Sequence, residues 1–169
     1  SPARTTVPEE NLEMPDELQA CGANLRTIYA AIKKYEKETG ALPDWLSDLV
    51  PDYLDKQALL CRGSGREKSP YWPDPKLPCS FTYEFSPTRL SGNWGPATGM
   101  TCREWKTRQV KFLGDVVPLV RCKHGSRALS LSVGGQVYWS SVLWESLFVP
   151  DYRRGRALPL EDRPFDYTV

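Results

Sequence analysis

The fold is decided by residues 18–35, which read LQACGANLRTIYAAIKKY. Apolar side chains recur there every three or four residues, at Leu18, Cys21, Leu25, Ile28, Ile32 and Tyr35. This spacing places them on one face of an α-helix. Asp16 and Glu17 follow Pro15, where the helix dipole favours acidic side chains, and Gly40 is placed to end the helix. The stretch predicts one long amphipathic helix packed on the rest of the chain.

Shorter elements are predicted beyond this helix. Residues 42–50 indicate a second short helix that begins at Pro43-Asp44, and residues 80–85 alternate apolar and polar side chains like a strand. Thr101 and Glu104 form a possible capping box for a helix that runs to about residue 113. These elements place an inserted helix within a region that otherwise favours strands.

The second half of the chain predicts an antiparallel sheet. Residues 116–121 and 144–148 indicate strands, and residues 129–133 alternate apolar side chains with serine. Gly134-Gly135 then leads into Val137 and Trp139, a pattern typical of a hairpin because both glycines can adopt positive φ. The predicted fold class is α+β, with the N-terminal amphipathic helix packed on an antiparallel sheet.

Length and composition favour one globular domain with extended ends. The chain has 169 residues and a net charge of +1, so no basic excess points to nucleic acid. Its apolar runs are too short to span a membrane. The polar, proline-rich ends predict an extended arm over residues 1–15 and an extended tail over residues 149–169, on either side of a domain at 16–148.

Five cysteines favour an oxidised, exported protein whose sites are structural. None lies in a Cys-x-x-Cys pair. Pairing Cys61 with Cys79 and Cys102 with Cys122 would close loops of 17 and 19 intervening residues, each stabilising the fold by about 3 kcal/mol. Sequence alone leaves the connectivity open, and Cys21 is expected to remain a buried thiol in the helix.

A zinc site is the alternative use of the same cysteines. Cys61, Cys79, Cys122 and His124 could supply the three sulfurs and one nitrogen of a Cys3His shell. The preferred expectation is disulfides, with no metal or other cofactor, and His124 before Gly125 in a turn.

Motifs of catalysis are missing from the sequence. His124 is the only histidine, so a histidine-based triad would have to be built around it, and the chain has no Gly-x-Ser-x-Gly elbow. Gly63-Ser64-Gly65 is not followed by the Lys-Ser/Thr of a phosphate-binding loop. We therefore expect no enzymatic activity.

Aromatic side chains in loops suggest a different class of function. Tyr71, Trp72 and Trp94 lie in segments rich in proline and glycine, where exposed rings could stack on a sugar or fill a partner's pocket. A secreted carbohydrate- or ligand-binding module is therefore the alternative to a structural protein, although loop aromatics commonly do no more than cover a core.

Several segments together resemble the globular part of bacterial type IV pilin-like and type II secretion pseudopilin-like proteins, of the prepilin-type kind found in planctomycetes and verrucomicrobia. These segments are residues 21–35 (CGANLRTIYAAIKKY), 40–43 (GALP), 59–61 (LLC), 117–124 (VPLVRCKH), 129–132 (LSLS), 135–138 (GQVY) and 144–145 (WE). The resemblance covers about residues 18–146. It implies an N-terminal helix laid over an antiparallel sheet, no catalysis, export to the periplasm, cell surface or medium, and partners among filament or secretion subunits.

The chain departs from that family at its beginning. Such proteins start with an apolar helical half that spans the membrane, whereas residues 1–20 here are polar and contain three prolines. Either that half was removed or the chain uses the head without an anchor. In the second case, self-assembly must use head surfaces or the terminal arms.

The charge distribution indicates which arms could meet. Residues 1–60 carry 6 basic and 11 acidic side chains, net −5, and residues 61–169 carry 16 and 10, net +6. The two halves could attract within one fold or between neighbouring subunits. For the second arrangement, the candidate interface residues are Val7, Glu9, Glu10, Leu12 and Met14 of the arm and Arg153, Arg154 and Arg156 of the tail.

Overall fold

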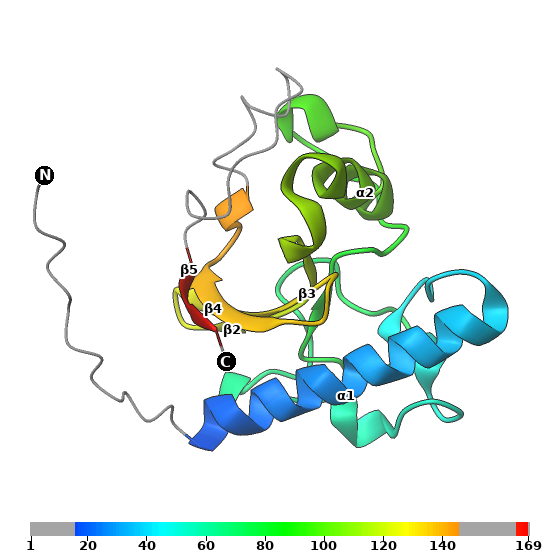
Figure 1. The fold of residues 1–169 in the computed structure, drawn as a ribbon, viewed down its shortest axis with the longest axis vertical. Helices are drawn as coiled ribbons and strands as arrows, with labels where there is room; N and C mark the ends of the chain where they lie inside the picture. Colours follow the sequence, from blue (N-terminus) through cyan, green and yellow to red (C-terminus); the bar gives the residue numbers. More distant parts are fainter. Residues whose placement is uncertain (1–15, 146–164, 169) are drawn as a thin grey trace, which may run out of the picture.

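Two helices lie on opposite sides of one antiparallel sheet. The computed structural model describes residues 16–145 and the strand at residues 165–168. Helix α1 (Asp16–Thr39) runs along one side of the sheet, and α2 (Cys102–Leu113) lies on the other (Figure 1). The predicted α+β class is confirmed, with the N-terminal helix on the sheet and the shorter helix inserted in the chain before its central strands.

Helix α1 buries the predicted face. Cys21, Leu25, Ile28 and Ile32 are all buried in it, while the lysines of its last turns are exposed. Gly40 adopts φ +81° directly after the helix, and its N–H donates to the carbonyl oxygen of Glu36 at 2.8 Å. A residue without a Cβ is favoured in this left-handed conformation, which explains why the helix ends there.

The sheet is built from neighbours in the sequence. Its strand order is β1-β2-β3-β4-β5, and every adjacent pair is antiparallel. The strands are β1 (Thr82–Tyr83), β2 (Pro118–His124), β3 (Arg127–Ser132), β4 (Val137–Ser141) and β5 (Phe165–Thr168). The hairpin predicted around Gly134-Gly135 is confirmed as the β3–β4 connection, and β5 adds a strand from within the segment predicted to be an extended tail.

The turn of that hairpin touches α1. Gly135 has φ +90°, and a Cβ at this position would lie 2.7 Å from Cε1 of Tyr29. Glycine is required at position 135 for two reasons: the positive φ of the backbone, and the Tyr29 ring, which occupies the space that a Cβ would need. This contact fixes how closely α1 approaches the end of the sheet.

The sheet has a separate hydrophobic core on each face. Leu129, Leu131 and Val137 pack with the buried face of α1, whereas Val117 and Tyr138 pack with α2. Because side chains alternate along a strand, Arg121 of β2 points toward α2, opposite its neighbour Cys122. Both faces are therefore covered, which explains why Ser130 and Ser132 are buried rather than solvated.

Helix α2 begins at the predicted capping box. The Thr101 hydroxyl accepts from the Glu104 N–H at 3.1 Å, and the Glu104 carboxylate accepts from the Thr101 N–H at 3.0 Å. Gly114 follows the helix with φ +75°. The prediction for this helix is confirmed at both ends.

Two predicted elements are shorter in the structure. The helix predicted over residues 42–50 is a 3-10 turn at Leu46–Leu49, and the strand predicted over 80–85 pairs only at Thr82–Tyr83. All side chains from 80 to 86 are buried. Glu84 lies beneath Lys106 of α2, whereas Ser80 and Thr82 are covered by the loop over residues 61–71, which they contact through hydrogen bonds. Of the strand predicted at 144–148, Trp144 and Glu145 lie outside the sheet and the rest lies outside the described residues.

The predicted arm at 1–15 and most of the tail at 149–169 also lie outside the described residues. Among the helices that are described, none combines the length and the apolar character needed to cross a membrane.

Candidate metal centre

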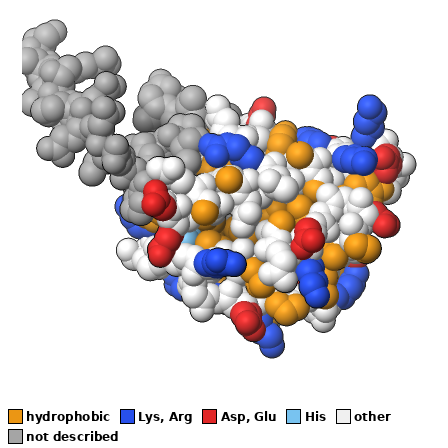
Figure 2. All heavy atoms as spheres, turned by 90° about the horizontal axis from the view of Figure 1, so that it is seen from below, with side chains coloured by type: hydrophobic (Ala, Val, Ile, Leu, Met, Phe, Trp, Pro, Cys, Tyr) orange, Lys and Arg blue, Asp and Glu red, His pale blue; other side chains and the backbone are white. Residues whose placement is uncertain are grey.

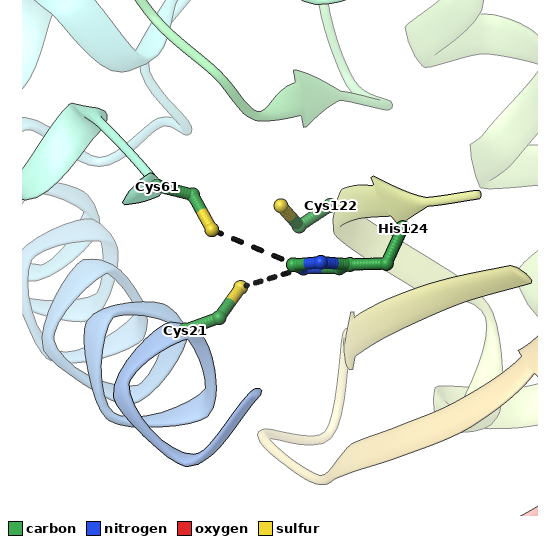
Figure 3. Close-up of side chains that lie close together, drawn as sticks. All are labelled: Cys21, Cys61, Cys122 and His124. Atoms are coloured by element: carbon green, nitrogen blue, oxygen red, sulfur yellow. Dashed lines mark hydrogen bonds between the residues drawn. The ribbon is translucent and has the colours of Figure 1, made fainter. Parts of the chain in front are cut away.

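Three sulfur atoms and one imidazole converge between α1 and the sheet. Cys21 comes from α1, Cys61 from the loop before β1, and Cys122 and His124 from β2, with their side chains pointing toward one another (Figure 3). Cys122 and His124 are two residues apart in a strand, so their side chains leave the same face of the sheet. The three cysteines are buried and His124 is half-buried.

The separations fit a tetrahedral shell. The four ligand atoms all lie within 4.8 Å of one another. Nε2 of His124 is 3.5 Å from Sγ of Cys21 and 3.9 Å from Sγ of Cys61. Zinc bonds of about 2.3 Å to sulfur and about 2.0–2.1 Å to nitrogen, at tetrahedral angles, put S···N at about 3.5 Å and S···S at about 3.8 Å. Small side-chain adjustments would place all four atoms at bonding distance from one ion.

Hydrogen bonds hold the Cys61 loop against its neighbours. The Cys61 N–H donates to Oγ of Ser80 at 2.9 Å, and Nδ2 of Asn24 in α1 donates to the carbonyl oxygen of Leu60 at 3.2 Å. On the other side, Nη1 of Arg66 donates to the carbonyl oxygen of Lys123 at 2.9 Å, between the two ligands of β2. The loop is thus tied to both elements that supply the other ligands.

The thiols differ in their readiness to ionise. Hydrogen bonds from Cys122 and Cys21 hold the pKa of Cys61 far below its usual value, against the opposing effect of burial. Hydrogen bonding to Cys21 and Cys61, together with burial, raises the pKa of Cys122. For Cys21, the bond from Cys122 lowers the pKa, but the bond to Cys61 and burial outweigh it and the net pKa is raised. Among the three thiols of the cluster, Cys61 is therefore the one whose pKa is lowered.

The alternative zinc set predicted from sequence shares three residues with this cluster. Cys61, Cys122 and His124 are present, but Cys21 stands in the place predicted for Cys79. The Cys79 thiol donates instead to the carbonyl oxygen of Phe81 at 3.4 Å, and burial raises its pKa to about 12. The sequence does not single out Cys21 as a ligand, because its position on the apolar face of the helix is also that of an ordinary core residue.

The disulfides predicted from loop length are not formed. All five cysteines are free thiols, and neither Cys61–Cys79 nor Cys102–Cys122 is bonded. Cys61 and Cys122 turn toward Cys21 and His124, while Cys102 belongs to the core beside α2, on the other face of the sheet. Strand alternation directs Cys122 toward α1 and away from Cys102, which loop length alone does not indicate.

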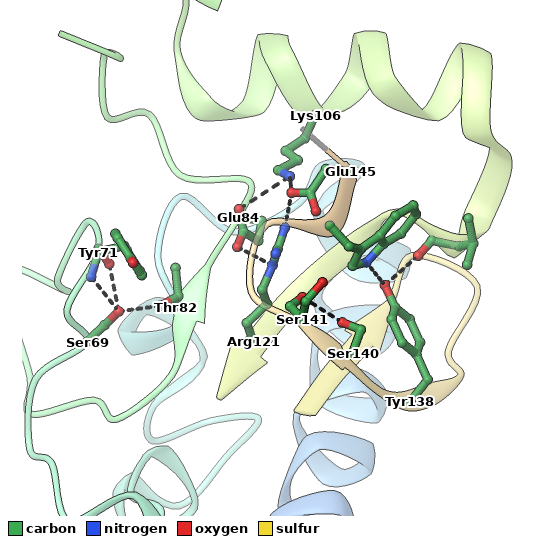
Figure 4. Close-up of polar contacts among 12 residues, drawn as sticks. Ser69, Tyr71, Thr82, Glu84, Lys106, Arg121, Tyr138, Ser140, Ser141 and Glu145 are labelled. Atoms are coloured by element: carbon green, nitrogen blue, oxygen red, sulfur yellow. Dashed lines mark hydrogen bonds and ion pairs between the residues drawn. The ribbon is translucent and has the colours of Figure 1, made fainter. Parts of the chain in front are cut away.

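A second polar cluster is fully buried beneath α2. Nζ of Lys106 lies 2.6 Å from Oε1 of Glu145 and 3.5 Å from Oε2 of Glu84, while Nε of Arg121 lies 2.8 Å from Oε1 of Glu84 (Figure 4). Arg121 also pairs with Glu145. Two acidic and two basic side chains cancel in charge, and each is at most 4% exposed. Burial raises the pKa of Glu145, but Arg121 and Lys106 lower it more, to about 2. The sequence analysis missed this cluster, although Arg121 within an apolar strand was a usable signal.

The loop aromatics predicted for ligand binding do come together. Ring centroids are 6.1 Å apart for Tyr71–Trp72 and 5.7 Å apart for Trp72–Trp94. Trp72 and Trp94 line a pocket of about 70 Å³ that also contacts the buried Gln109 and Glu145. Ser69 ties the backbone of Tyr71 to β1, since its hydroxyl donates to the carbonyl oxygen of Tyr71 at 2.7 Å and also bonds Thr82.

The predicted interface residues of the arm and the tail lie outside the described residues. These are Val7, Glu9, Glu10, Leu12, Met14, Arg153, Arg154 and Arg156.

Comparisons with protein families, with curated proteins and with solved structures find no match to this chain.

Proposed function

We propose that this chain is a non-enzymatic structural subunit, a pilin- or pseudopilin-like head that self-assembles into an extracellular filament or takes part in type II secretion or type IV pilus machinery. The support is architectural. An N-terminal helix of 24 residues lies along an antiparallel sheet and keeps one long face uncovered by the described residues. This is the arrangement that the resemblance implies.

The uncovered face of α1 is the observation that carries the proposal. It presents short side chains at helical spacing, namely Ala20, Ala23, Thr27 and Ala30, all exposed. Figure 2 shows the molecule from this side, with hydrophobic side chains across the middle and charged ones around them. Short side chains let another helix or sheet approach closely, so this face suits lateral contact between subunits.

The candidate site is consistent with a structural role. The one histidine of the chain faces thiols, and the buried ion cluster balances its own charges. Export, however, rests on the resemblance alone, because the disulfides that supported it are not formed.

The experiment is assembly of the full chain, followed by light scattering and negative-stain microscopy. We expect filaments or defined oligomers from the unmodified protein. Ala23→Arg should reduce assembly without changing the melting temperature, whereas Thr107→Arg, which places the same side chain on the exposed face of α2, should leave assembly unchanged. A protein that stays monomeric at every concentration, or an Ala23→Arg variant that assembles normally, would contradict the proposal.

The terminal arms are a second proposed contact. Deleting residues 1–14 should abolish the oligomers seen by light scattering and leave the melting temperature nearly unchanged. Burial of Val7, Leu12 and Met14 on a neighbour would supply most of the affinity, and exposed charge pairs little. Equal assembly of the shortened chain would remove the arm from the interface.

A ligand-binding module is the second candidate function, and the Tyr71–Trp72–Trp94 cluster favours it. Trp72 has φ +44°, a conformation that a bulky residue rarely adopts and that often marks a functional position. The pocket's 70 Å³ is well below the roughly 300–1,000 Å³ of typical small-molecule sites, which favours one functional group rather than a whole sugar. Titration of tryptophan fluorescence with soluble polysaccharides tests this candidate: saturable change lost in Trp94→Ala supports it, and no change counts against it.

A further inference from the structure

We propose that Cys21, Cys61, Cys122 and His124 bind one Zn²⁺ ion as a closed structural site that fastens the start of α1 to the sheet. The proposal goes beyond the assembly function above and is independent of it. It rests on the convergence of four ligand side chains from three separate segments of the chain.

The donor set selects the metal. Three thiolates and one imidazole are soft or borderline ligands, which suit Zn²⁺ and disfavour Ca²⁺ and Mg²⁺, whose shells are built from oxygen. Among the described residues, no carboxylate belongs to the cluster. Cys3His with tetrahedral geometry is a common structural zinc shell, and the two Nε2–Sγ separations, 3.5 and 3.9 Å, lie at and slightly above the value of about 3.5 Å expected for one.

The coordination number defines the role. Four protein ligands complete a tetrahedral shell and leave no position for an activated water, so the site is structural rather than catalytic. Nε2 of His124 is the atom that faces the sulfurs, so binding requires the tautomer with its proton on Nδ1. Each thiol that is protonated releases its proton to solvent when it binds the ion.

The proposed ion would lie where three separate segments of the chain meet. Cys21 lies near the first turns of α1, and Cys61 lies in a loop that hydrogen bonds tie to α1 and β2. Cys122 lies in β2, where it is paired with Leu129 of β3. Gly63, two residues beyond Cys61, passes so close that an added Cβ would lie 3.5 Å from Cε1 of His124. One ion would therefore join helix, loop and strand at a single point.

The chain supplies its own matched controls. Cys79 and Cys102 are buried cysteines outside the cluster, so Cys79→Ser and Cys102→Ser make the same chemical change without removing a ligand. The ligand variants are Cys21→Ser, Cys61→Ser and Cys122→Ser.

The first measurement is metal content of the full chain, produced with zinc and desalted. We expect close to one zinc per chain in the unmodified protein and in both control variants, and at least a roughly tenfold lower content in the ligand variants. Less than one zinc in ten chains of the unmodified protein, or equal loss in the Cys79→Ser control, would overturn the proposal.

The second measurement does not depend on variants that fold. Exchange of the unmodified protein with Co²⁺ should give the intense visible bands of tetrahedral cobalt and a near-ultraviolet thiolate-to-cobalt band, and added Zn²⁺ should abolish both. Weak bands typical of six-coordinate cobalt, without the thiolate band, would refute the site even if every ligand variant unfolds.

Discussion

The buried ion cluster beneath α2 makes the sharpest stability prediction. Glu145 is 2% exposed and pairs with both Lys106, at 2.6 Å, and Arg121. Glu145→Gln keeps the shape of the side chain but removes one negative charge, so two buried cations then share the single carboxylate of Glu84. Breaking a buried pair by removing one partner costs about 3–5 kcal/mol, because the remaining charge stays desolvated.

That loss is large for a chain of 169 residues. At about 2–4 °C per kcal/mol, the melting temperature should fall by roughly 6–20 °C. Urea unfolding followed by circular dichroism measures the free energy directly, provided that the slope with denaturant is unchanged. Glu67→Gln, the same change at an exposed position, is the control and should cost less than about 0.5 kcal/mol.

A second substitution separates charge from packing. Lys106→Met in the Glu145→Gln background leaves Arg121 with Glu84 and restores neutrality. The double variant should therefore be more stable than the sum of the two single losses predicts, by at least about 1 kcal/mol. A Glu145→Gln variant that loses less than about 1 kcal/mol, or purely additive losses, would mean that these four charges are not coupled in a desolvated cluster.

Three further outcomes are expected. Ile28→Ala, at the centre of the buried face of α1, should lower the free energy of unfolding in urea by about 2–5 kcal/mol. Lys33→Ala on the exposed face should lower it by less than about 0.5 kcal/mol, and equal effects would mean that the helix is not packed as described. Gly135→Ala should lower the melting temperature more than Gly92→Ala, because both have positive φ but only Gly135 meets a tyrosine ring at 2.7 Å; equal shifts would exclude the contact. The pKa of Glu145 is lowered from 4.5 to about 2, so its contribution to stability is complete above pH 4.5 and is lost as the pH falls toward 2. Glu145→Gln should not show this loss, and acid unfolding curves that are identical for the variant and the unmodified protein would contradict the prediction.

The local elements of the fold were readable from sequence because each carries a short-range signal. Apolar side chains from Leu18 to Tyr35 recur with the period of an α-helix and not with that of a strand. The Thr101–Glu104 pair has the spacing at which two side chains satisfy backbone N–H groups at the start of a helix. Gly134-Gly135 likewise marks a turn whatever surrounds it. These signals involve residues a few positions apart, so no knowledge of tertiary packing was needed.

The metal centre and the buried ion cluster are formed by side chains from segments that are far apart in the sequence. Their residues could therefore be predicted only in part. Cys21 and Cys122 are far apart in the sequence, although the fold brings them together. An apolar helix position also explains Cys21 without any ligand. Nothing local in the sequence indicates that Glu84 and Lys106 are buried, because only the packing of α2 on the second face of the sheet covers them. The zinc alternative found Cys61, Cys122 and His124 because they are chemically distinctive, but only the packing of α1 shows the fourth residue.

Hydrogen exchange measured by mass spectrometry, on the zinc-loaded full chain with and without a zinc chelator, tests the central claim that a metal ion fastens α1 to the sheet. If the ion joins α1 to the sheet, chelation should speed amide exchange around Cys21, Cys61 and Cys122 and leave exchange in α2, which packs on the far face, unchanged. Exchange that is the same in both states, or that rises equally in α2, would contradict it.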